Sequence, residues 1–342
     1  MNIKFWGVRG SLPSPITPIE IRNRIKEALE TVLRRQPAPQ DLDAFIDELP
    51  PSTASTVGGN TPCLEIREGD EVLIIDAGTG IVGLGRSLHA GPGSCELSEL
   101  MAAADLKGAL FHNRLAVDRP RHLTLLLTHT HWDHIQGFPF FGPAYHCGNV
   151  IDVYGENGER IKEALTVQQA SPRLFPVSLQ QAGADIRFHS FPANGLTTGP
   201  FSIDSLPLPH PGGSLAFRIK VRNRVVVFAT DYELVDAEPD SDRNRVELTR
   251  FAQDADVFIS DTQYTYLESM TKEGWGHSNP LKVVEMAMKA DVKKFFLFHH
   301  DPYYSDAKLY DMLRKTVTYT NLLYPGHDLE VRLAIEGETV TV

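Results

Sequence analysis

The stretch TLLLTHTHWDHIQGF, residues 124–138, decides how the rest of the chain is interpreted. It begins with an apolar run of the kind found in strands that are covered on both faces. His129, His131, Asp133 and His134 follow directly, in the pattern HxHxDH. Residues two apart in an extended backbone face the same way, so the first two histidines can reach one point while Asp133 and His134 turn toward a neighbouring one. Because imidazole nitrogens and carboxylate oxygens are the usual ligands of zinc and similar ions, the stretch predicts parts of two adjacent metal sites.

Further ligand candidates stand at the ends of other apolar runs. SIDSLPLPH ends at His210, RVVVFATD ends at Asp231, and KKFFLFHHDP contains His299 and His300. Each of them stands where a loop begins, so all can converge on one edge of a sheet. A single polar residue at a strand end is more often a turn former, but together with the HxHxDH pattern these positions predict a shared site.

Composition and charge limit the classes of function. The 342 residues are 42% apolar and 23% charged, and the net charge is −11. This acidic balance disfavours an extended nucleic acid as partner, although it leaves room for a local basic pocket. The three cysteines show no CxxC pairing, and no stretch reaches the length of a membrane span, so we expect a reduced cytoplasmic protein with no membrane partner. A homodimer is compatible with the sequence.

The order of expected elements indicates a mixed α/β layered fold. Helices are expected from Asn279 and from Ser305, each residue serving as an N-cap. Two segments, about 14–56 and about 86–121, are interpreted as helical insertions, either packed excursions or lids over the site. Strands are expected at 2–8, at 122–128, 150–155, 185–191, 201–208, 214–221, 224–230, 257–261, 293–299 and 329–335, with a hairpin over 61–78.

Four strings carry a resemblance to a known family. WGVRGS, GGNTPCLEI, LIIDAGTG and THTHWDHIQGFPFF resemble the metallo-β-lactamase superfamily, in the branch of ribonuclease Z and the bacterial cyclic-phosphate and cyclic-nucleotide phosphodiesterases. The resemblance covers nearly the whole chain outside the two insertions. It implies one domain over 1–342, a four-layer αββα sandwich with metals at one edge of the paired sheets. An aspartate at 231, rather than a cysteine, fits the hydrolases of this branch.

The resemblance also implies a ligand set for two divalent ions, with Zn²⁺ expected and Mn²⁺ or Fe as alternatives. Asp231 would bridge the two ions, and Asp76 would hydrogen-bond to a ligand histidine and orient it without binding an ion itself. His299 is favoured over His300 because HHDP aligns with the H-x-S-P ending of the family. The first ion takes His129, His131 and His210, and the second takes Asp133, His134 and His299.

Such a metal pair predicts hydrolysis, because two cations share a water and lower its pKa. Asp133 is expected to accept a proton, and His277 in EGWGHSNP to act as general acid toward the leaving alkoxide. Arg9, Ser11 and Asn60 lie in loops suited to binding a phosphate, although an arginine there serves a structural salt bridge equally well.

The expected substrate is a small or cyclic, nucleotide-like phosphodiester. Three alternatives stay open: a lactone, thioester or carboxylic ester hydrolase on the same metal pair, a tRNA 3′-processing endonuclease, and a non-catalytic metal-binding sensor. A missing basic Gly-Pro-rich arm argues against tRNA, and the full set of ligands argues against the sensor.

Overall fold

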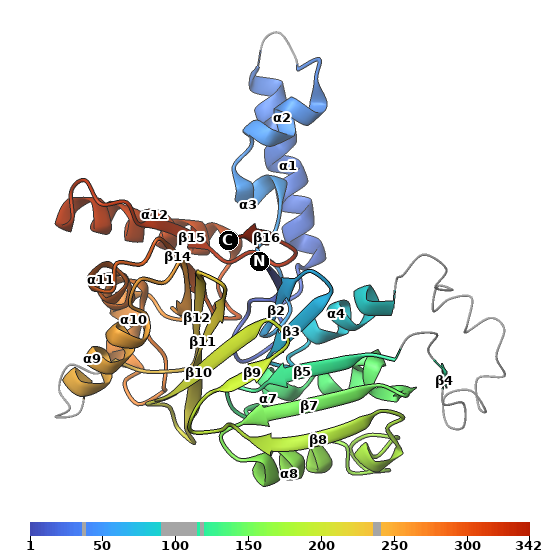
Figure 1. Ribbon diagram of the computed structural model, residues 1–342. Coiled ribbons are helices and arrows are strands. Elements are labelled where there is room, and N and C mark those ends of the chain that lie inside the picture. The colour runs from blue at the N-terminus through green and yellow to red at the C-terminus, as the bar shows by residue number, and fades with distance from the viewer. Residues whose placement is uncertain (36–38, 90–114, 117–119, 235–240) are drawn as a thin grey trace.

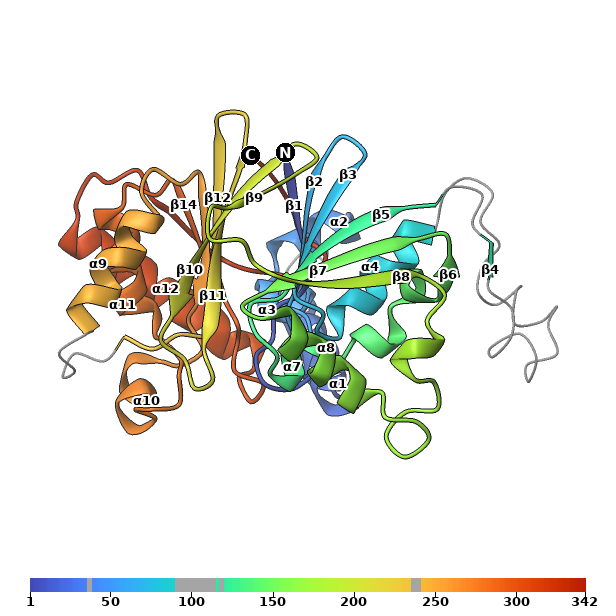
Figure 2. The same ribbon diagram turned by 60° about the horizontal axis from the view of Figure 1, so that its bottom comes forward.

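The computed structural model describes residues 1–35, 39–89, 115–116, 120–234 and 241–342. Two seven-stranded sheets lie face to face, with helices on their outer sides, so the expected layered α/β sandwich is confirmed (Figures 1 and 2). The first sheet has the strand order β16 (Thr339–Thr341), β1 (Asn2–Gly7), β2 (Cys63–Glu68), β3 (Glu71–Ile75), β5 (His122–Leu126), β7 (Val150–Gly155) and β8 (Asp185–Ser190).

The second sheet belongs to the C-terminal half of the chain. Its strand order is β15 (Glu330–Leu333), β14 (Lys294–Phe298), β13 (Val257–Asp261), β12 (Arg224–Ala229), β11 (Ser214–Val221), β10 (Phe201–Leu208) and β9 (Leu196–Thr198). Strands β12, β13 and β14 run parallel to one another, whereas β10 and β11 form an antiparallel hairpin at the side of the sheet. A small pair joins β4 (Leu115–Ala116) and β6 (His146–Cys147).

Helices cover the outer face of each sheet. α4 (Gly80–His89) and α8 (Gly158–Gln168) pack on the first sheet, whereas α9 (Ser241–Phe251), α11 (Pro280–Lys289) and α12 (Asp306–Leu323) pack on the second (Figure 2). Short helical turns are α7 (Trp132–Ile135), α10 (Tyr266–Thr271) and the 3₁₀ turns Phe138–Phe140, Gly142–Tyr145 and Leu179–Gln181. Among the described helices, none is both long and apolar enough to cross a membrane.

The main hydrophobic core fills the space between the sheets. Phe5 of β1 contacts Phe296 and Phe298 of β14, with ring centroids 5.3 Å and 6.3 Å apart. All three side chains are fully buried, and burying a phenylalanine contributes roughly 1.5–3 kcal/mol each. A second cluster lies between the first sheet and α4 and α8. The paired sheets are therefore held together by apolar packing, which fixes the positions of the loops at their ends.

The expected helix starts are present where local chemistry dictates them. Asn279 caps α11 by accepting from the backbone N–H of Lys282, and Pro280 occupies the first helical position. Ser305 caps α12 in the same way, accepting from the backbone of Lys308. The short strands β9 and β16 were not expected, because segments of three residues are too brief to show a hydrophobic period.

The segment from 14 to 56 contains three helices, α1 (Pro18–Arg34), α2 (Leu42–Glu48) and α3 (Pro51–Ala54), and α1 and α2 project from the body of the molecule (Figure 1). Thr17 and Glu20 form a capping box at the start of α1. Most of the second expected insertion, about 86–121, lies outside the described residues. A single domain with two insertions stays a prediction.

Candidate metal centre

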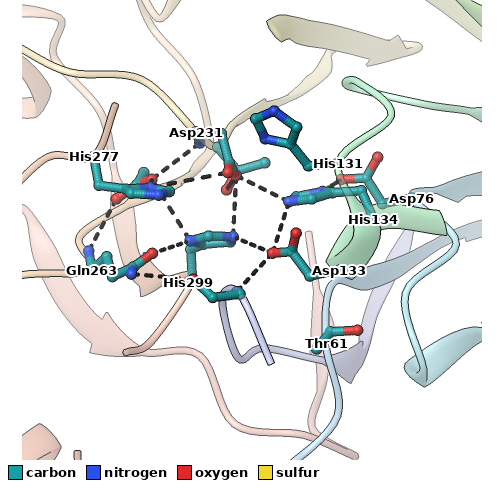
Figure 3. A network of polar contacts seen from close by, with 12 residues as sticks. Thr61, Asp76, His131, Asp133, His134, Asp231, Gln263, His277 and His299 are labelled. Atoms are coloured by element: carbon teal, nitrogen blue, oxygen red, sulfur yellow. Dashed lines mark hydrogen bonds and ion pairs between the residues drawn. The ribbon is translucent and has the colours of Figure 1, made fainter. Parts of the chain in front are cut away.

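The expected metal ligands meet at one end of the paired sheets, as Figure 3 shows for most of them. The HxHxDH segment follows β5 of the first sheet, and Asp76 follows β3. His210, Asp231 and His299 follow β10, β12 and β14 of the second sheet. These strands present their carboxyl ends at the same edge, which is where open α/β sheets ordinarily bind ligands. The site therefore bridges the two sheets.

The first cluster consists of His129, His131, His210 and Asp231. Its ligand atoms all lie within 4.8 Å of one another. Nε2 of His210 lies 3.0 Å from Nδ1 of His131, and Nε2 of His129 lies 3.7 Å from Oδ2 of Asp231. Nδ1 of His210 lies 2.9 Å from the carbonyl oxygen of Gly276, which leaves its other nitrogen for the cluster.

The second cluster shares Asp231 with the first. Asp133, His134, Asp231 and His299 place one ligand atom each within 4.8 Å of one another. Nε2 of His134 lies 3.2 Å from Oδ1 of Asp231, and Nε2 of His299 lies 3.2 Å from that same oxygen and from Oδ2 of Asp133. The two oxygens of Asp231 therefore face different clusters, which is the position of a bridging carboxylate.

The donor set fits divalent cations. Nε2 of His129 is buried and makes no hydrogen bond with the described residues, and Nε2 of His134 is buried beside the carboxylates of Asp133 and Asp231 without forming a hydrogen bond to either. A buried polar atom without a partner is unfavourable unless a ligand satisfies it. Burial lowers the pKa of His129, His131 and His210, despite the opposing effect of Asp231, so these rings are neutral and offer a lone pair.

The two carboxylates of the centre remain ionised. Burial by itself would raise the pKa of Asp133 and Asp231, but neighbouring histidines, His134 and His299 among them, lower it well below the usual value. The pKa of His134 is raised well above its usual value, because three carboxylates outweigh the effect of burial. The protein therefore gathers negative charge that a cation would neutralise.

Asp76 lies behind the second cluster and is completely buried. One of its oxygens lies 2.8 Å from Nδ1 of His134, and the other accepts from the backbone N–H of Thr128 at 2.9 Å. The hydroxyl of Thr128 also donates to Asp76. This arrangement holds the ring of His134 with Nε2 directed at the centre, which is the contact a ligand-orienting carboxylate makes.

The pair of adjacent histidines separates into two environments. His299 points into the cluster, and its Nδ1 lies 2.8 Å from the amide oxygen of Gln263. His300 points away, with Nε2 2.9 Å from the carbonyl oxygen of Ala334, and burial lowers its pKa to about 3. Geometry therefore favours His299 over His300 as the ligand.

His277 lies at the side of the centre. Its Nδ1 is 2.8 Å from Oδ2 of Asp261, and its ring stacks on His299 with centroids 5.0 Å apart. Burial alone would lower the pKa of His277, but Asp261 and Asp231 raise it to about 9. The ring is therefore protonated at neutral pH, a state suited to a general acid.

Asp261 is absent from the expected site residues, although it forms a third group with Asp231, His277 and His299. It ends β13 directly after a buried apolar run, and its oxygens accept from the backbone N–H groups of Asp231 and Gln263. In the sequence, Asp261 follows the apolar residues of VFISD just as Asp231 follows those of RVVVFATD, so the same rule for polar residues at strand ends predicts both.

Of the three residues expected to bind substrate, Arg9 and Asn60 direct their side chains to structural partners outside the clusters. Arg9 is 3% exposed, and its guanidinium donates to backbone carbonyls and to Asp306 at 3.1 Å. The amide of Asn60 donates to Glu336. Ser11 touches the centre through its backbone, whose N–H donates to Oδ2 of Asp133 at 2.7 Å. Arg9 and Asn60 thus serve structural contacts in this structure, because their donors are already engaged.

Four of the seven described non-glycine residues with positive φ lie at the centre. Asp76, Asp231 and His299 have φ values of 61°, 58° and 60°, and Ser11 has 62°. Residues with a side chain seldom adopt this left-handed region, and such outliers gather at functional sites. Asp76, Asp231 and His299 each follow the end of a strand, and the left-handed turn there directs the side chain toward the centre.

A cavity of about 110 Å³ opens beside the first cluster. The residues that line it include His129 and His131 of the cluster together with Glu156, Arg160 and Gly212. Trp132 and Trp275, which neighbour His131 and His277 through the chain, are 70% and 61% exposed. The cavity therefore offers the guanidinium of Arg160 to a ligand beside the first cluster.

Comparison with known families places this geometry in context. The family model described as "Beta-lactamase superfamily domain" matches residues 73–300, more than half of the chain. Ribonuclease Z from Picrophilus torridus is 39% identical over 64 residues, covering 18% of this chain and 20% of that protein. Ribonuclease Z from Exiguobacterium sibiricum is 27% identical over 225 residues, covering 55% of this chain and 74% of that protein. The chain therefore aligns with only a fifth of the first relative.

Solved structures share the fold over the whole chain. The metallo-beta-lactamase fold protein YhfI from Bacillus subtilis is 18% identical, with a TM-score of 0.55 over 99% of this chain and 98% of its own. Unliganded yeast PDE1 is 13% identical, with a TM-score of 0.59 over 100% and 99%. At these identities the likeness establishes the architecture.

Proposed function

The chain belongs to the beta-lactamase superfamily, and from this premise we propose that it is a metal-dependent phosphodiesterase acting on a small or cyclic, nucleotide-like phosphodiester. One observation carries the proposal. Two clusters of histidine and aspartate share Asp231, and His277 stands beside them. This arrangement supports a pair of divalent cations with an acid group next to them.

The ligand roles follow from the geometry. His129, His131 and His210 would hold one cation, and Asp133, His134 and His299 the other, with Asp231 between them. Bound cations lower the pKa of a water toward neutrality and neutralise negative charge that builds on a phosphoryl oxygen. Nitrogen ligands with two carboxylates suit Zn²⁺ best, and Mn²⁺ and iron are alternatives.

The chain's own residues supply the proton transfers. His277, protonated at neutral pH and held by Asp261, donates a proton to the departing oxygen. Asp133 accepts the proton of the attacking water, because its carboxylate stays ionised inside the cluster. Asp76 keeps His134 oriented while these groups react.

A phosphodiester is favoured over a carboxylic ester on two grounds. Both sequence relatives are ribonucleases Z, enzymes of phosphodiester chemistry by name. Trp132, which directly follows His131 in the chain, has an exposed ring suited to stacking on a nucleobase, which aromatic side chains do with little dependence on base identity. Arg160 at the cavity adds a cation for a second charged oxygen of the substrate.

A tRNA 3′-processing endonuclease is the second candidate, because the same ribonuclease Z relatives support it. The net charge of −11 weighs against it, since grip on an extended polyanion needs clustered lysine and arginine. The small substrate is therefore preferred, and the two candidates differ in a measurable way.

The test is turnover by the purified full chain loaded with Zn²⁺ or Mn²⁺. Cyclic and linear nucleotides, bis(p-nitrophenyl) phosphate, a precursor tRNA, a lactone and a thioester are supplied in parallel. We expect cleavage of small phosphodiesters with kcat/KM exceeding that for both acyl substrates. Efficient processing of the precursor tRNA without cleavage of cyclic nucleotides would support the second candidate instead.

Two results would overturn the proposal. Robust lactone or thioester cleavage without phosphodiester turnover would assign the site to acyl chemistry. No turnover of any substrate by protein with a full metal load would indicate a sensor. Asp231→Asn provides the matched control in each assay. It removes the negative charge shared by both clusters but keeps the size and shape of the side chain.

A further inference from the structure

A carboxylate outside the two metal clusters holds a loop next to them. Glu233 accepts the backbone N–H of Gly274 at 3.0 Å through Oε1 and that of Gly276 at 2.8 Å through Oε2. Both glycines have positive φ, 81° and 83°, a conformation that residues with a side chain seldom adopt. Hydrogen bonds to an ionised acceptor are about twice as strong as neutral ones. The carboxylate is therefore suited to hold the loop in this conformation.

The loop in turn sets the direction of a metal ligand. Nδ1 of His210 lies 2.9 Å from the carbonyl oxygen of Gly276. Because a carbonyl oxygen only accepts, this contact favours the tautomer with hydrogen on Nδ1 and a lone pair on Nε2. Gly276 is buried, and a Cβ atom there would lie 2.3 Å from Nδ1 of His210, closer than unbonded atoms approach. Only glycine at 276 allows the loop to hold the ring this closely.

The backbone of Glu233 provides a second connection to the same ligand. Its N–H donates to the carbonyl oxygen of Pro209, which precedes His210 in the chain, at 3.0 Å. Glu233 therefore reaches His210 by two routes, one through the backbone and one through the loop 274–276. His277, the acid of the proposed reaction, directly follows this loop, so its place beside the centre depends on the same carboxylate.

We propose that Glu233 is a positioning residue of the metal centre, whose carboxylate orients His210 as a ligand of the first cation through the carbonyl oxygen of Gly276. The assignment rests on the metal pair of the proposed function but not on its substrate. Asp76 holds His134 of the second cluster by direct contact, so each cluster has one carboxylate that orients a ligand histidine from outside. Loss of the Glu233 carboxylate should therefore weaken the binding of one cation and leave the other.

The first test measures how many cations bind and how tightly. The full chain, freed of metal, is titrated with Zn²⁺ against a chromophoric chelator, and the metal content is checked by elemental analysis. The wild-type chain should bind two ions. Glu233→Gln should bind one of them with unchanged affinity and the other roughly 10–100-fold more weakly. Glu273→Gln, at an exposed position of the same loop, is the matched control and should bind both ions as the wild-type chain does.

The outcomes separate this assignment from the proposed function. Two ions bound with unchanged affinities by Glu233→Gln would overturn the assignment and leave the metal pair intact. Equal weakening of both ions would also overturn it, because Glu233 would then support the fold in general. A wild-type chain that binds no ion would overturn the proposed function itself, and the assignment with it.

The second test observes the ring of His210 directly, in the absence of metal. Long-range proton–nitrogen NMR of histidine-labelled protein reports which ring nitrogen carries hydrogen, and His210→Gln identifies the signal by its absence. We expect a single tautomer, with hydrogen on Nδ1, in the wild-type chain and a mixture of both tautomers in Glu233→Gln. The same single tautomer in Glu233→Gln would overturn the assignment, because the loop would then hold the ring without the carboxylate.

A pair of glycine variants tests the contact between the loop and the ring. Gly276→Ala and Gly274→Ala impose similar backbone strain, because both positions have positive φ. A Cβ atom at Gly274, however, meets no atom of the described residues within 4 Å. The first cation should therefore bind at least about 10-fold more weakly to Gly276→Ala than to Gly274→Ala. Equal affinities in the two variants would overturn the route through Gly276.

Discussion

At the scale of single residues, each side chain of the centre has a partner that sets its orientation or charge. Asp76 is the clearest example, because its two oxygens are divided between His134 and the Thr128 loop. It touches no other predicted ligand, so its effect on chemistry passes through His134. His277 depends in the same way on Asp261.

Asp76→Asn tests the positioning role. The amide keeps the shape but loses the charge that holds His134, so metal affinity and kcat/KM should fall roughly 10–100-fold. Binding is measured by competition with a chromophoric chelator and turnover with bis(p-nitrophenyl) phosphate. Asp152→Asn is the matched control, since Asp152 also contacts histidines, His122 and His189, but lies outside the clusters. Equal losses in both variants would contradict the role.

His277 makes a prediction about pH. Its raised pKa of about 9 means that the proton is bound at neutral pH and lost as the pH rises. The rate should therefore decline on the alkaline side, at or below pH 9, because bound cations oppose the positive ring. His277→Gln should lower kcat by roughly 10²–10⁴-fold and remove that decline.

Asp261→Asn distinguishes an acid from a merely packed histidine. Because Asp261 raises the pKa of His277, its removal should move the alkaline decline of the rate to lower pH. The measurement is the pH profile of kcat from pH 6 to 10, a range that spans the ordinary histidine value and the raised one. A decline that stays in place in both variants would assign the proton donation to another group.

At the scale of elements, α10 depends on a small ionic network. Glu268 closes the capping box with Thr265, contacts Tyr304 Oη, and accepts from Lys308 at 2.7 Å. Burial opposes ionisation, but these partners lower the pKa of Glu268 to about 2. Its contribution to stability is therefore complete above its unfolded value near 4.5 and is lost as the pH falls toward 2.

Glu268→Gln tests this dependence. The free energy of unfolding of the wild-type chain should decrease between pH 4.5 and about 2 more steeply than that of the variant. Chemical denaturation at several pH values measures both. Glu159→Gln, in the first turn of α8, is the control at an exposed helix start. Parallel curves for the wild-type chain and Glu268→Gln would show that the network contributes nothing in acid.

At the scale of the whole molecule, the metal centre connects the two sheets. His129 to His134 follow the first sheet, and His210, Asp231 and His299 follow the second. An isolated β-bridge between the two sheets near this point pairs Arg9 with His300. Cations at the centre would therefore tie together two layers that otherwise associate through apolar packing.

Metal removal should lower stability as well as activity. A ligand that binds only the folded state adds about 2.7 kcal/mol at a concentration 100 times its Kd. We expect a chelator to lower the thermal midpoint and added Zn²⁺ to restore it, with metal content followed by elemental analysis. Asp231→Asn should show a smaller response. A midpoint indifferent to chelation in metal-loaded protein would contradict the bridging role.

The sequence alone determined the layered fold, because buried strands, capping residues and Pro at a helix start act locally. Asn279 and Thr17 are recognisable from their neighbours within one helical turn. The HxHxDH pattern and the strand-end residues also placed Asp231 at the centre. Adjacent ligands follow from backbone direction, and distant ones from the rule that parallel strands end at one edge.

Only the tertiary structure decided the roles that depend on side-chain direction. Arg9 was expected at the substrate, but it is engaged by Asp306 and backbone carbonyls, because β1 ends where α12 begins. The family resemblance favoured His299 over His300, but the physical reason lies in the tertiary structure, where a left-handed turn at His299 directs that ring to the centre and His300 to Ala334. Asp261 likewise could be assigned only from the tertiary structure, because its contact with His277 depends on how distant segments of the chain pack together.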